Sequence, residues 1–523
     1  MQTATATAIP IVAAVLLALA PPAGAQQQPL PPPQPPAERE YALTVYSTAD
    51  PATFDPKQLA QQRQMNPYQF RFPGYGVVRD LRAVNLDAGL NTLRFTDVAS
   101  GIDPTTVAFE SLTDPAATAV VEQSYEYDVV SGNKLIDKYV GERVEVWQRL
   151  GDRVQPVAGT LLSADPSAVV LQSADGQVTV IARQDVTSVS VGGAKGLITK
   201  PTLVWQVQAA QAGEHRARVT YQTDGLTWRA DYNVVVNRDD TAADLGAWVT
   251  VVNQSGASYP DAKLKLVAGD VQRITPPEQM HEMGYAMSRM AAADRAGPPG
   301  FQQKAFFEYH LYTLGRPTTL PNNATKQIEL FDARRDVPVK KQYVYYGLPE
   351  QWRYWVAPSP NTDRNLGSQT NKKVDVYLSM RNDEKNGMGI PLPAGRVRVY
   401  KQDDADGTNE FVGEDVVQHT PKDENVLVKL GSAFDVVGER KQTDFTVNAD
   451  GHVITESFEI KLCNHKPQPV DVIVKENLFR WVNWEITASS DKWEKQDYRT
   501  IHVPVNVPAN GEKVVTYTVR YTW

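Results

Sequence analysis

Apolar and polar residues alternate in short runs along most of the chain, a pattern typical of β-strands rather than helices. In the run from Trp228 to Val236, Tyr232 and Val234 share one face at a spacing of two. The run from Leu245 to Val252 is apolar on both faces, as expected for a strand inside a sandwich. With the run from Lys263 to Ala268, these segments predict a three-stranded meander.

Similar short runs, separated by turn residues, continue on both sides of this meander and predict an all-β protein of several β-sandwiches. The chain has 523 residues, too many for a single hydrophobic core. We predict an N-terminal β domain over residues 41–138, ending in a short helix near 132–139, and a central β domain over 201–440 with a flexible loop at 276–300. Residues 441–523 show the strand spacing of an immunoglobulin-like sandwich.

Five short strands are expected between residues 139 and 192, where turn signals come at close spacing. A tight Asp175-Gly176 turn marks a hairpin between two of them. Five strands in so short a segment predict a small SH3-like or Sm-like barrel inserted into the chain. Such barrels often bind peptides or RNA, but this segment lacks a basic face, so a structural insert is the favoured interpretation.

Residues 1–25 have the features of a secretory signal peptide. Ile9 to Ala20 is a short apolar segment, and Ala23-Gly24-Ala25 fits a cleavage site, although no Lys or Arg precedes the apolar segment. The alternative is an N-terminal anchor that is retained. Residues 26–40 follow as a proline-rich linker, expected to be an extended polyproline II segment. We therefore expect an exported protein, in the periplasm or at the cell surface.

Charge and cysteine content narrow the function classes. The chain has 53 Lys and Arg against 61 Asp and Glu, a net charge of −8, and these charges are interspersed. A nucleic-acid partner would require a basic stripe, so we expect none. Cys463 is the only cysteine, which excludes an intramolecular disulfide, and its position on an expected strand indicates a buried, inert thiol.

Three segments begin like metal or phosphate motifs and then depart from them. His281-Glu282-Met283-Gly284-Tyr285 has tyrosine where a zinc-binding helix needs its second histidine. Aligning Gly407 with the invariant glycine of a calcium loop puts Gly413, not glutamate, at the last position, so residues 403–407 are expected to form a hairpin tip. The glycine-rich residues 192–196 lack the phosphate-loop pattern. We predict no metal and no cofactor.

The densest aromatic cluster of the sequence is its candidate binding site. Exposed aromatic side chains bind sugar rings or partner proteins through their flat apolar faces. The favoured alternative is a buried plug between domains, because aromatic residues on strands usually pack inward. The cluster consists of Tyr343, Tyr345, Tyr346, Trp352, Tyr354 and Trp355.

Long, ordered motifs carry a resemblance to a known family. They include the segments from Tyr221 to Tyr232, Leu264 to Asp270 and Pro391 to Tyr400, and the closing segment from Tyr517 to Tyr521. These motifs resemble bacterial secreted proteins of the family called domain of unknown function 4139, over roughly residues 41–523. The resemblance implies a secreted, β-rich protein without an established activity, and some relatives carry a mucoidy-inhibitor name. It offers no catalytic residues to transfer.

No reaction motif accompanies the expected signal peptide, linker and sandwiches. The leading hypothesis is a non-catalytic binding or scaffolding component of the bacterial cell envelope. Its partner would be an unidentified envelope protein or polysaccharide, with peripheral membrane association as an option. The alternative is an envelope polysaccharide or peptidoglycan hydrolase, which would need two close carboxylates beside Trp352 or Trp355. A minor alternative, an outer-membrane β-barrel, is suggested by the alternating last strand from Glu512 to Trp523.

Overall fold

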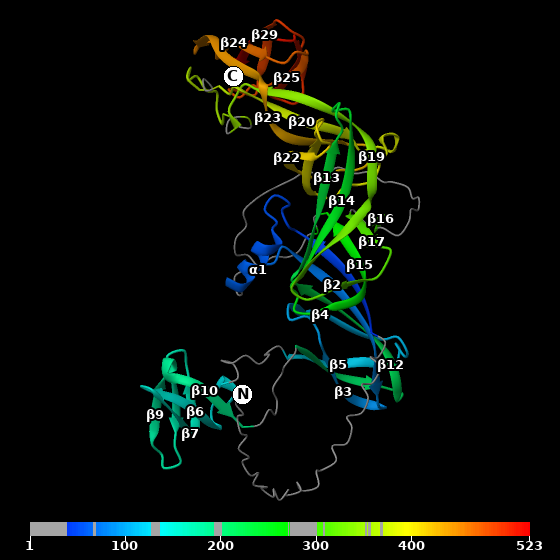
Figure 1. Cartoon of the computed structure of the whole chain (residues 1–523), viewed down its shortest axis with the longest axis vertical. Helices are drawn as coiled ribbons and strands as arrows, with labels where there is room; N and C mark the ends of the chain where they lie inside the picture. The colour runs from blue at the N-terminus through cyan, green and yellow to red at the C-terminus, as the bar shows by residue number, and fades with distance from the viewer. Residues whose placement is uncertain are drawn as a thin grey trace, which may run out of the picture. The chain divides into compact units, whose positions relative to one another are not determined.

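A computed structural model describes most of the chain from Arg39 to Trp523, where nearly all regular structure is β (Figure 1). In the described part, the strands form sheets of thirteen, eight, five and three strands, which confirms the all-β, multi-sheet prediction. No helix in this part is long and apolar enough to cross a membrane. The described residues are 39–65, 70–126, 136–192, 201–269, 271, 301–306, 309–350, 353, 357–366 and 370–523.

Several sequence predictions concern segments outside the described residues. They are the signal peptide at 1–25, nearly all of the linker at 26–40, the loop at 276–300 with its His281 motif, and most of the glycine-rich residues 192–196. The helix expected near 132–139 is described only from residue 136 onward, and it is helical there through residue 138.

An eight-stranded sheet begins with the first described strand, β1 (Glu40–Ser47). β1 pairs in parallel with β15 (Tyr259–Ala268) and antiparallel with β2 (Gly74–Leu86). β2 also pairs with β12 (Gly213–Asp224), so segments of the predicted N-terminal and central domains share one sheet. The other strands are β4 (Ile102–Ser111), β16 (Phe301–Phe306), β17 (Tyr309–Leu314) and β18 (Thr318–Leu320).

A three-stranded sheet packs its inner face around Trp205. In order, its strands are β3 (Gly89–Thr96), β11 (Thr202–Ala209) and β5 (Thr118–Glu126). Trp205 is fully buried on β11, and its ring centroid lies 5.3 Å from those of both Phe95 and Phe109. These residues belong to the hydrophobic core that also contains the buried residues of the eight-stranded sheet.

The segment expected to form a small barrel is an open five-stranded sheet. Its strands are β6 (Arg143–Leu150), β7 (Arg153–Ala164), β8 (Ala168–Gln172), β9 (Val178–Ala182) and β10 (Val186–Val191). The pairing order is β10-β6-β7-β8-β9, and in the described segment no pairing joins β9 to β10. A short 3-10 turn, Arg183–Asp185, carries the chain between these two edges instead of a hairpin. The five predicted strands are therefore confirmed, but the expectation of a closed barrel is corrected.

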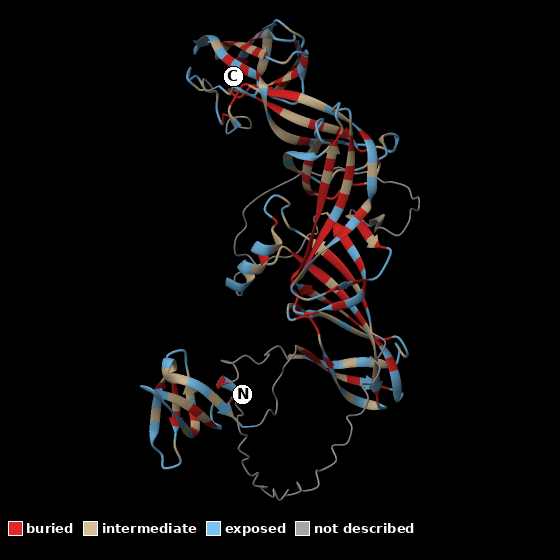
Figure 2. Ribbon diagram, in the orientation of Figure 1, coloured by how far each residue is buried: buried red, intermediate tan, exposed pale blue. Residues whose placement is uncertain are grey.

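The thirteen-stranded sheet contains two strands of the predicted meander. β13 (Leu226–Val236) and β14 (Ala242–Asn253) form an antiparallel hairpin, and buried positions run along both strands (Figure 2). The third expected strand, β15, belongs to the eight-stranded sheet, so the prediction of a three-stranded meander was wrong. The amide of buried Asn253 donates to the carbonyls of Ala257 and Leu320, and this holds the loop that leads the chain out of the hairpin.

A parallel strand and a hairpin complete this end of the sheet. β21 (Gly395–Gln402) pairs in parallel with β13 and antiparallel with β22 (Asn409–Val417). Between them Gly407 has a positive φ of 76° and donates its backbone N–H to the carbonyl of Asp403. The residues that begin like a calcium loop are thus a hairpin tip, as predicted.

Two long strands pass from one hydrophobic core to another. β19 (Ala324–Tyr346) pairs first with β14 and then with β20 (Lys373–Arg381), and β20 pairs with β23 (Asn425–Asn448). Val337 of β19 lies in the first core, whereas Tyr345 lies in the second. The predicted division between residues 440 and 441 falls inside β23, where the hydrogen-bonded ladder is continuous.

The C-terminal sandwich encloses this second core between two layers. One layer continues from β23 through β24 (Val453–Asn464), β29 (Gly511–Thr522) and β26 (Trp484–Ser489). The other contains β25 (Val470–Asn477), β28 (Thr500–Val507) and β27 (Glu494–Lys495). Alternate residues of β24 are buried, and Cys463 falls on the outer face, half-buried rather than buried as expected. Burial and the nearby Glu512 raise the pKa of its thiol, which keeps it protonated.

One helix, α1 (Pro56–Met65), lies between β1 and β2 inside the segment predicted as an N-terminal β domain. Leu59 is its buried residue, and it packs with Phe54 and Val252 in a small cluster. A helix with so little apolar surface gives almost no periodic signal. Two residues signal the start of this helix. Asp55 accepts the backbone N–H of Lys57 with its carboxylate, and Pro56 stands at the first helical position.

Candidate functional site

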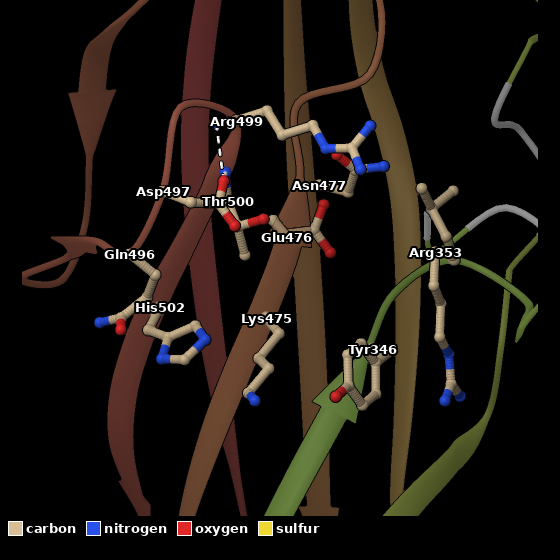
Figure 3. Close-up of a pocket in the computed structure, with 11 residues that line it drawn as sticks. Tyr346, Arg353, Lys475, Glu476, Asn477, Gln496, Asp497, Arg499, Thr500 and His502 are labelled. Atoms are coloured by element: carbon tan, nitrogen blue, oxygen red, sulfur yellow. Dashed lines mark hydrogen bonds between the residues drawn. The ribbon is translucent and has the colours of Figure 1, made fainter. Parts of the chain in front are cut away.

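A pocket of about 230 Å³ opens in the C-terminal sandwich where β19 ends beside β25 and β28 (Figure 3). It is assembled from segments far apart in the sequence. The lining residues are Tyr346, Leu348, Arg353, Lys475, Glu476, Asn477, Gln496, Asp497, Arg499, Thr500 and His502.

Strand register brings three of these side chains side by side. β25 pairs in parallel with β19, which sets Lys475 opposite Tyr346, and antiparallel with β28, which sets Lys475 opposite His502. Directly paired residues on neighbouring strands point to the same face of a sheet. Figure 3 shows Lys475 between Tyr346 and His502, and its ammonium lies 5.6 Å from the centroid of the Tyr346 ring.

A tight turn before β28 forms another wall. The carboxylate of Asp497 accepts the backbone N–H groups of Arg499 and Thr500, each at 2.8 Å. The backbone N–H of Leu478 in turn donates to the carbonyl of Arg499 at 2.8 Å. Asp497 therefore holds the turn in shape, and the turn presents the Arg499 side chain to the pocket.

Glu476 connects the pocket to the interior of the sandwich. Its Oε2 accepts hydrogen bonds from Nε of Arg440 at 2.8 Å and from the hydroxyl of Tyr517 at 2.5 Å. All three residues are buried. Burial and the carboxylate beside it raise the pKa of Tyr517, and although burial alone would lower the pKa of Arg440, the carboxylate raises it. This carboxylate is thus part of a structural ion pair.

A second buried network lies in the same core. The carboxylate of Glu456 accepts from Nε of Arg480 at 2.7 Å and from the amide of Gln442 at 3.1 Å. Arg480 is fully buried and also donates to the carbonyls of Asp363 and Leu366. Removing one partner of such a pair leaves an uncompensated charge, so these networks fix the packing around the pocket.

The pocket carries an excess of positive charge. Arg353 pairs with Asp375 at 3.1 Å, whereas Lys475 and Arg499 form no ion pair with a carboxylate in the described residues. Nη1 of Arg499 is buried and has no hydrogen-bond acceptor there. Burial lowers the pKa of Lys475, and burial with the charge of Lys475 lowers the pKa of His502 to about 4. The site therefore holds two partly desolvated cations and a neutral imidazole near neutral pH.

The predicted aromatic cluster is divided by strand alternation. Tyr343 and Tyr345 point into the second core, where Tyr345 is fully buried and its hydroxyl donates to the carbonyl of Asn371 at 2.6 Å. Tyr346 faces the other way and lines the pocket. The remaining predicted residues, Trp352, Tyr354 and Trp355, lie outside the described residues.

Residues 217–523, more than half of the chain, match the model of the family described as Domain of unknown function (DUF4139). The chain belongs to this family. A search of curated proteins found no match. The matched region of the DUF4139 family contains every lining residue of the pocket, whereas the five-stranded sheet of β6 to β10 lies before it. The family match does not extend to the mucoidy-inhibitor name, which rests on the sequence resemblance alone.

The sequence did not single out Lys475, Arg499 or His502. Lys475 and His502 meet through the antiparallel pairing of β25 with β28, and Tyr346 joins them through the parallel pairing of β19 with β25. Pairings between separate segments of the chain leave no local pattern. The detectable signal was the end of β25, where the apolar alternation Val470, Val472, Val474 gives way to charged residues. Among the described residues, no group of three or more His, Cys, Asp or Glu is placed to hold a metal ion.

Proposed function

We propose that the protein is an exported, non-catalytic component of the bacterial cell envelope that binds its partner through the pocket between β19, β25 and β28. One observation carries this proposal: Lys475 and Arg499 line the pocket, and neither forms a salt bridge with a carboxylate in the described part of the chain. Charges that are partly removed from water are costly unless they are paired. A bound ligand of opposite charge would supply that pairing.

Binding is favoured over hydrolysis because both carboxylates of the pocket have structural roles. Oε2 of Glu476 is occupied by Arg440 and Tyr517, and Asp497 holds the turn before β28. Glycoside hydrolysis by two carboxylates needs one that can give a proton to the leaving group. In both side chains one carboxylate oxygen is held by structural hydrogen bonds, which favours a structural role over proton transfer.

Export is supported by the N-terminal sequence, with its apolar segment from Ile9 to Ala20 and its cleavage site at Ala23 to Ala25. The proline-rich residues 26–40 would space the folded part from the membrane or wall. Both features support the envelope location that the proposal requires.

Fractionation of the native host tests the location. Carbonate and urea washes of the membranes, followed by detection with an antibody, are expected to find the protein in the periplasm, the medium or a peripheral envelope fraction. Sequencing of the mature N-terminus should then begin at or near Gln26. Recovery in the cytoplasm with an intact Met1 would overturn the proposal.

A further inference from the structure

We infer that the outer face of β13, β14 and β21 is a second binding surface, which holds a neutral polysaccharide chain. The inference goes beyond the proposed function, because this surface shares no residue with the pocket. It rests on an exposed tryptophan inside the sheet, on polar groups beside it that have no partner, and on the way the charges of the face are paired.

Strand alternation and register place one set of side chains on this face. Tyr232 and Val234 of β13 are buried in the first core. The residues that alternate with them, Asp231, Asn233 and Val235, therefore point to the opposite side of the sheet. β13 pairs antiparallel with β14 and in parallel with β21, and directly paired residues point to the same side. These pairings add Gly246 and Trp248 of β14 and Arg396, Arg398 and Tyr400 of β21 to the face.

Trp248 is 40 % exposed although β14 lies between β13 and β19 inside the thirteen-stranded sheet (Figure 1). Aromatic residues on interior strands usually pack inward. In the described part of the chain, no cation lies over the Trp248 ring and its indole N–H has no acceptor. Beside it Gly246 leaves the face open, since a Cβ at this position would meet no atom within 4 Å. A flat, uncovered ring next to a gap fits the C–H face of a sugar ring.

Polar groups without a partner lie on the same face. The side-chain amide of Asn233, which is paired with Gly246, and the hydroxyl of Tyr400 form no hydrogen bond with any described residue. An amide and a phenol both donate and accept hydrogen bonds, as sugar hydroxyl groups do. Phe411 of β22 is 56 % exposed and packs edge-on against Tyr400, with 5.8 Å between the ring centroids. The face therefore combines free hydrogen-bonding groups with apolar rings.

The spacing of the aromatic residues favours a polymer over a single sugar. Trp248 is paired with Asp231 of β13. Tyr400 is paired with Val235, four residues further along the same strand. Four residues along the strand and two strand spacings across it give about 16 Å between Trp248 and Tyr400, from about 3.3 Å per residue and about 4.8 Å per strand. Asn233 lies between them, so a chain of linked rings could contact all three side chains.

The paired charges of the face favour an uncharged ligand. The guanidinium of Arg398 lies 3.8 Å from the carboxylate of Asp231 and 3.5 Å from that of Glu414. Arg396 donates to the carbonyl of Ala52 at 3.0 Å. An anionic polymer would meet no cation of β21 without a partner on this face and would approach two carboxylates. A neutral chain meets neither obstacle.

This surface is expected to assist the pocket rather than to replace it. A few stacking and hydrogen-bonding contacts on an open face give a weak affinity. A weak site that is linked to another one still raises the overall affinity for an envelope that presents both ligands.

Isothermal titration calorimetry of the purified protein tests the inference. The probes are cellohexaose and chitohexaose, which are neutral, and trigalacturonic acid, which is anionic. At least one neutral hexasaccharide is expected to bind, with an affinity that hardly changes with salt. Trp248→Ala should weaken this binding by about tenfold, and Asn233→Ala by about two- to tenfold.

Gly246→Val fills the gap beside Trp248 without removing a contact. Because its Cβ meets no atom and a β-branched residue suits a strand, thermal stability should not fall, whereas the affinity should fall by about tenfold. Phe434→Ala is the matched control, since Phe434 is 94 % exposed but lies on β23, outside this face. It should leave the affinity unchanged.

The inference is overturned if neither hexasaccharide binds, if trigalacturonic acid binds as tightly as they do, or if Trp248→Ala or Gly246→Val binds them normally. The double variant Lys475→Gln, Arg499→Gln should bind the hexasaccharides as the wild type does. If it loses them, the sugar site is in the pocket and the inference is wrong. Failure of the sugar titration leaves the proposed function standing, because binding of cell envelopes through the pocket is measured separately.

Discussion

Replacing Glu476 with glutamine removes the negative charge that faces the guanidinium of Arg440 inside the C-terminal sandwich. The two side chains are 0 % and 1 % exposed, and their nitrogen–oxygen distance is 2.8 Å. Tyr517 loses a charged acceptor in the same variant. Removing one partner of a buried ion pair leaves the other charge uncompensated, which typically costs about 3–5 kcal/mol of unfolding free energy.

Urea denaturation followed by tryptophan fluorescence measures this loss, because Trp481, Trp484 and Trp523 pack against the same core. With a slope of about 2 kcal/mol/M, the midpoint of this transition should fall by about 1.5–2.5 M. Glu512→Gln is the matched control, since Glu512 pairs with Lys461 at the surface, where such a pair contributes about 0–1 kcal/mol.

The double variant Arg440→Met, Glu476→Leu completes the test. Replacing both partners with apolar residues of similar size removes the unpaired charge, so it should recover much of the stability lost in Glu476→Gln. If Glu476→Gln is no less stable than Glu512→Gln, the ion pair does not hold the sandwich together and the reasoning is refuted.

Three further predictions concern other parts of the chain. Burial and the charge of Lys475 lower the pKa of His502 to about 4, from about 6.5 in the unfolded chain. The neutral imidazole therefore contributes stability that is fully present above about pH 6.5 and is lost as the pH falls through about 4. Between about pH 7 and about pH 4 this contribution to the free energy of unfolding should change by roughly 1–2 kcal/mol, after allowance for solvent screening. Urea midpoints at the two pH values measure the change, and His502→Asn should remove it. Gly438→Ala places a Cβ against the buried ring of Tyr345 and should cost about 1–3 kcal/mol in thermal unfolding. Residues 139–192, which have their own core, should fold cooperatively when expressed alone, and a random-coil circular dichroism spectrum would contradict this.

Local alternation was enough to predict most strands of the C-terminal sandwich. In β29, Val515, Tyr517, Val519 and Tyr521 are buried while the residues between them are at least partly exposed, as the period of two requires. The same rule could have separated the aromatic cluster, since Tyr345 and Tyr346 are consecutive on β19 and must face opposite ways.

Pairings between distant segments could not be predicted in this way. β1 lies parallel to β15, and β19 lies parallel to β25, and in each case a long stretch of chain separates the partners. Such contacts depend on the whole fold rather than on neighbouring residues. The meander and the pocket depended on pairings of this kind, which explains why the first was predicted wrongly and the second was missed. The barrel is a different case, because its open edges, β9 and β10, are adjacent in sequence and are separated by the 3-10 turn Arg183–Asp185.

The binding role of the pocket is tested most directly by co-sedimentation of the purified full-length chain with isolated cell envelopes. The wild type and Lys461→Gln are expected to sediment with the envelopes, whereas the double variant Lys475→Gln, Arg499→Gln is expected to stay in solution. Equal sedimentation of all three folded proteins would contradict a binding role for the pocket.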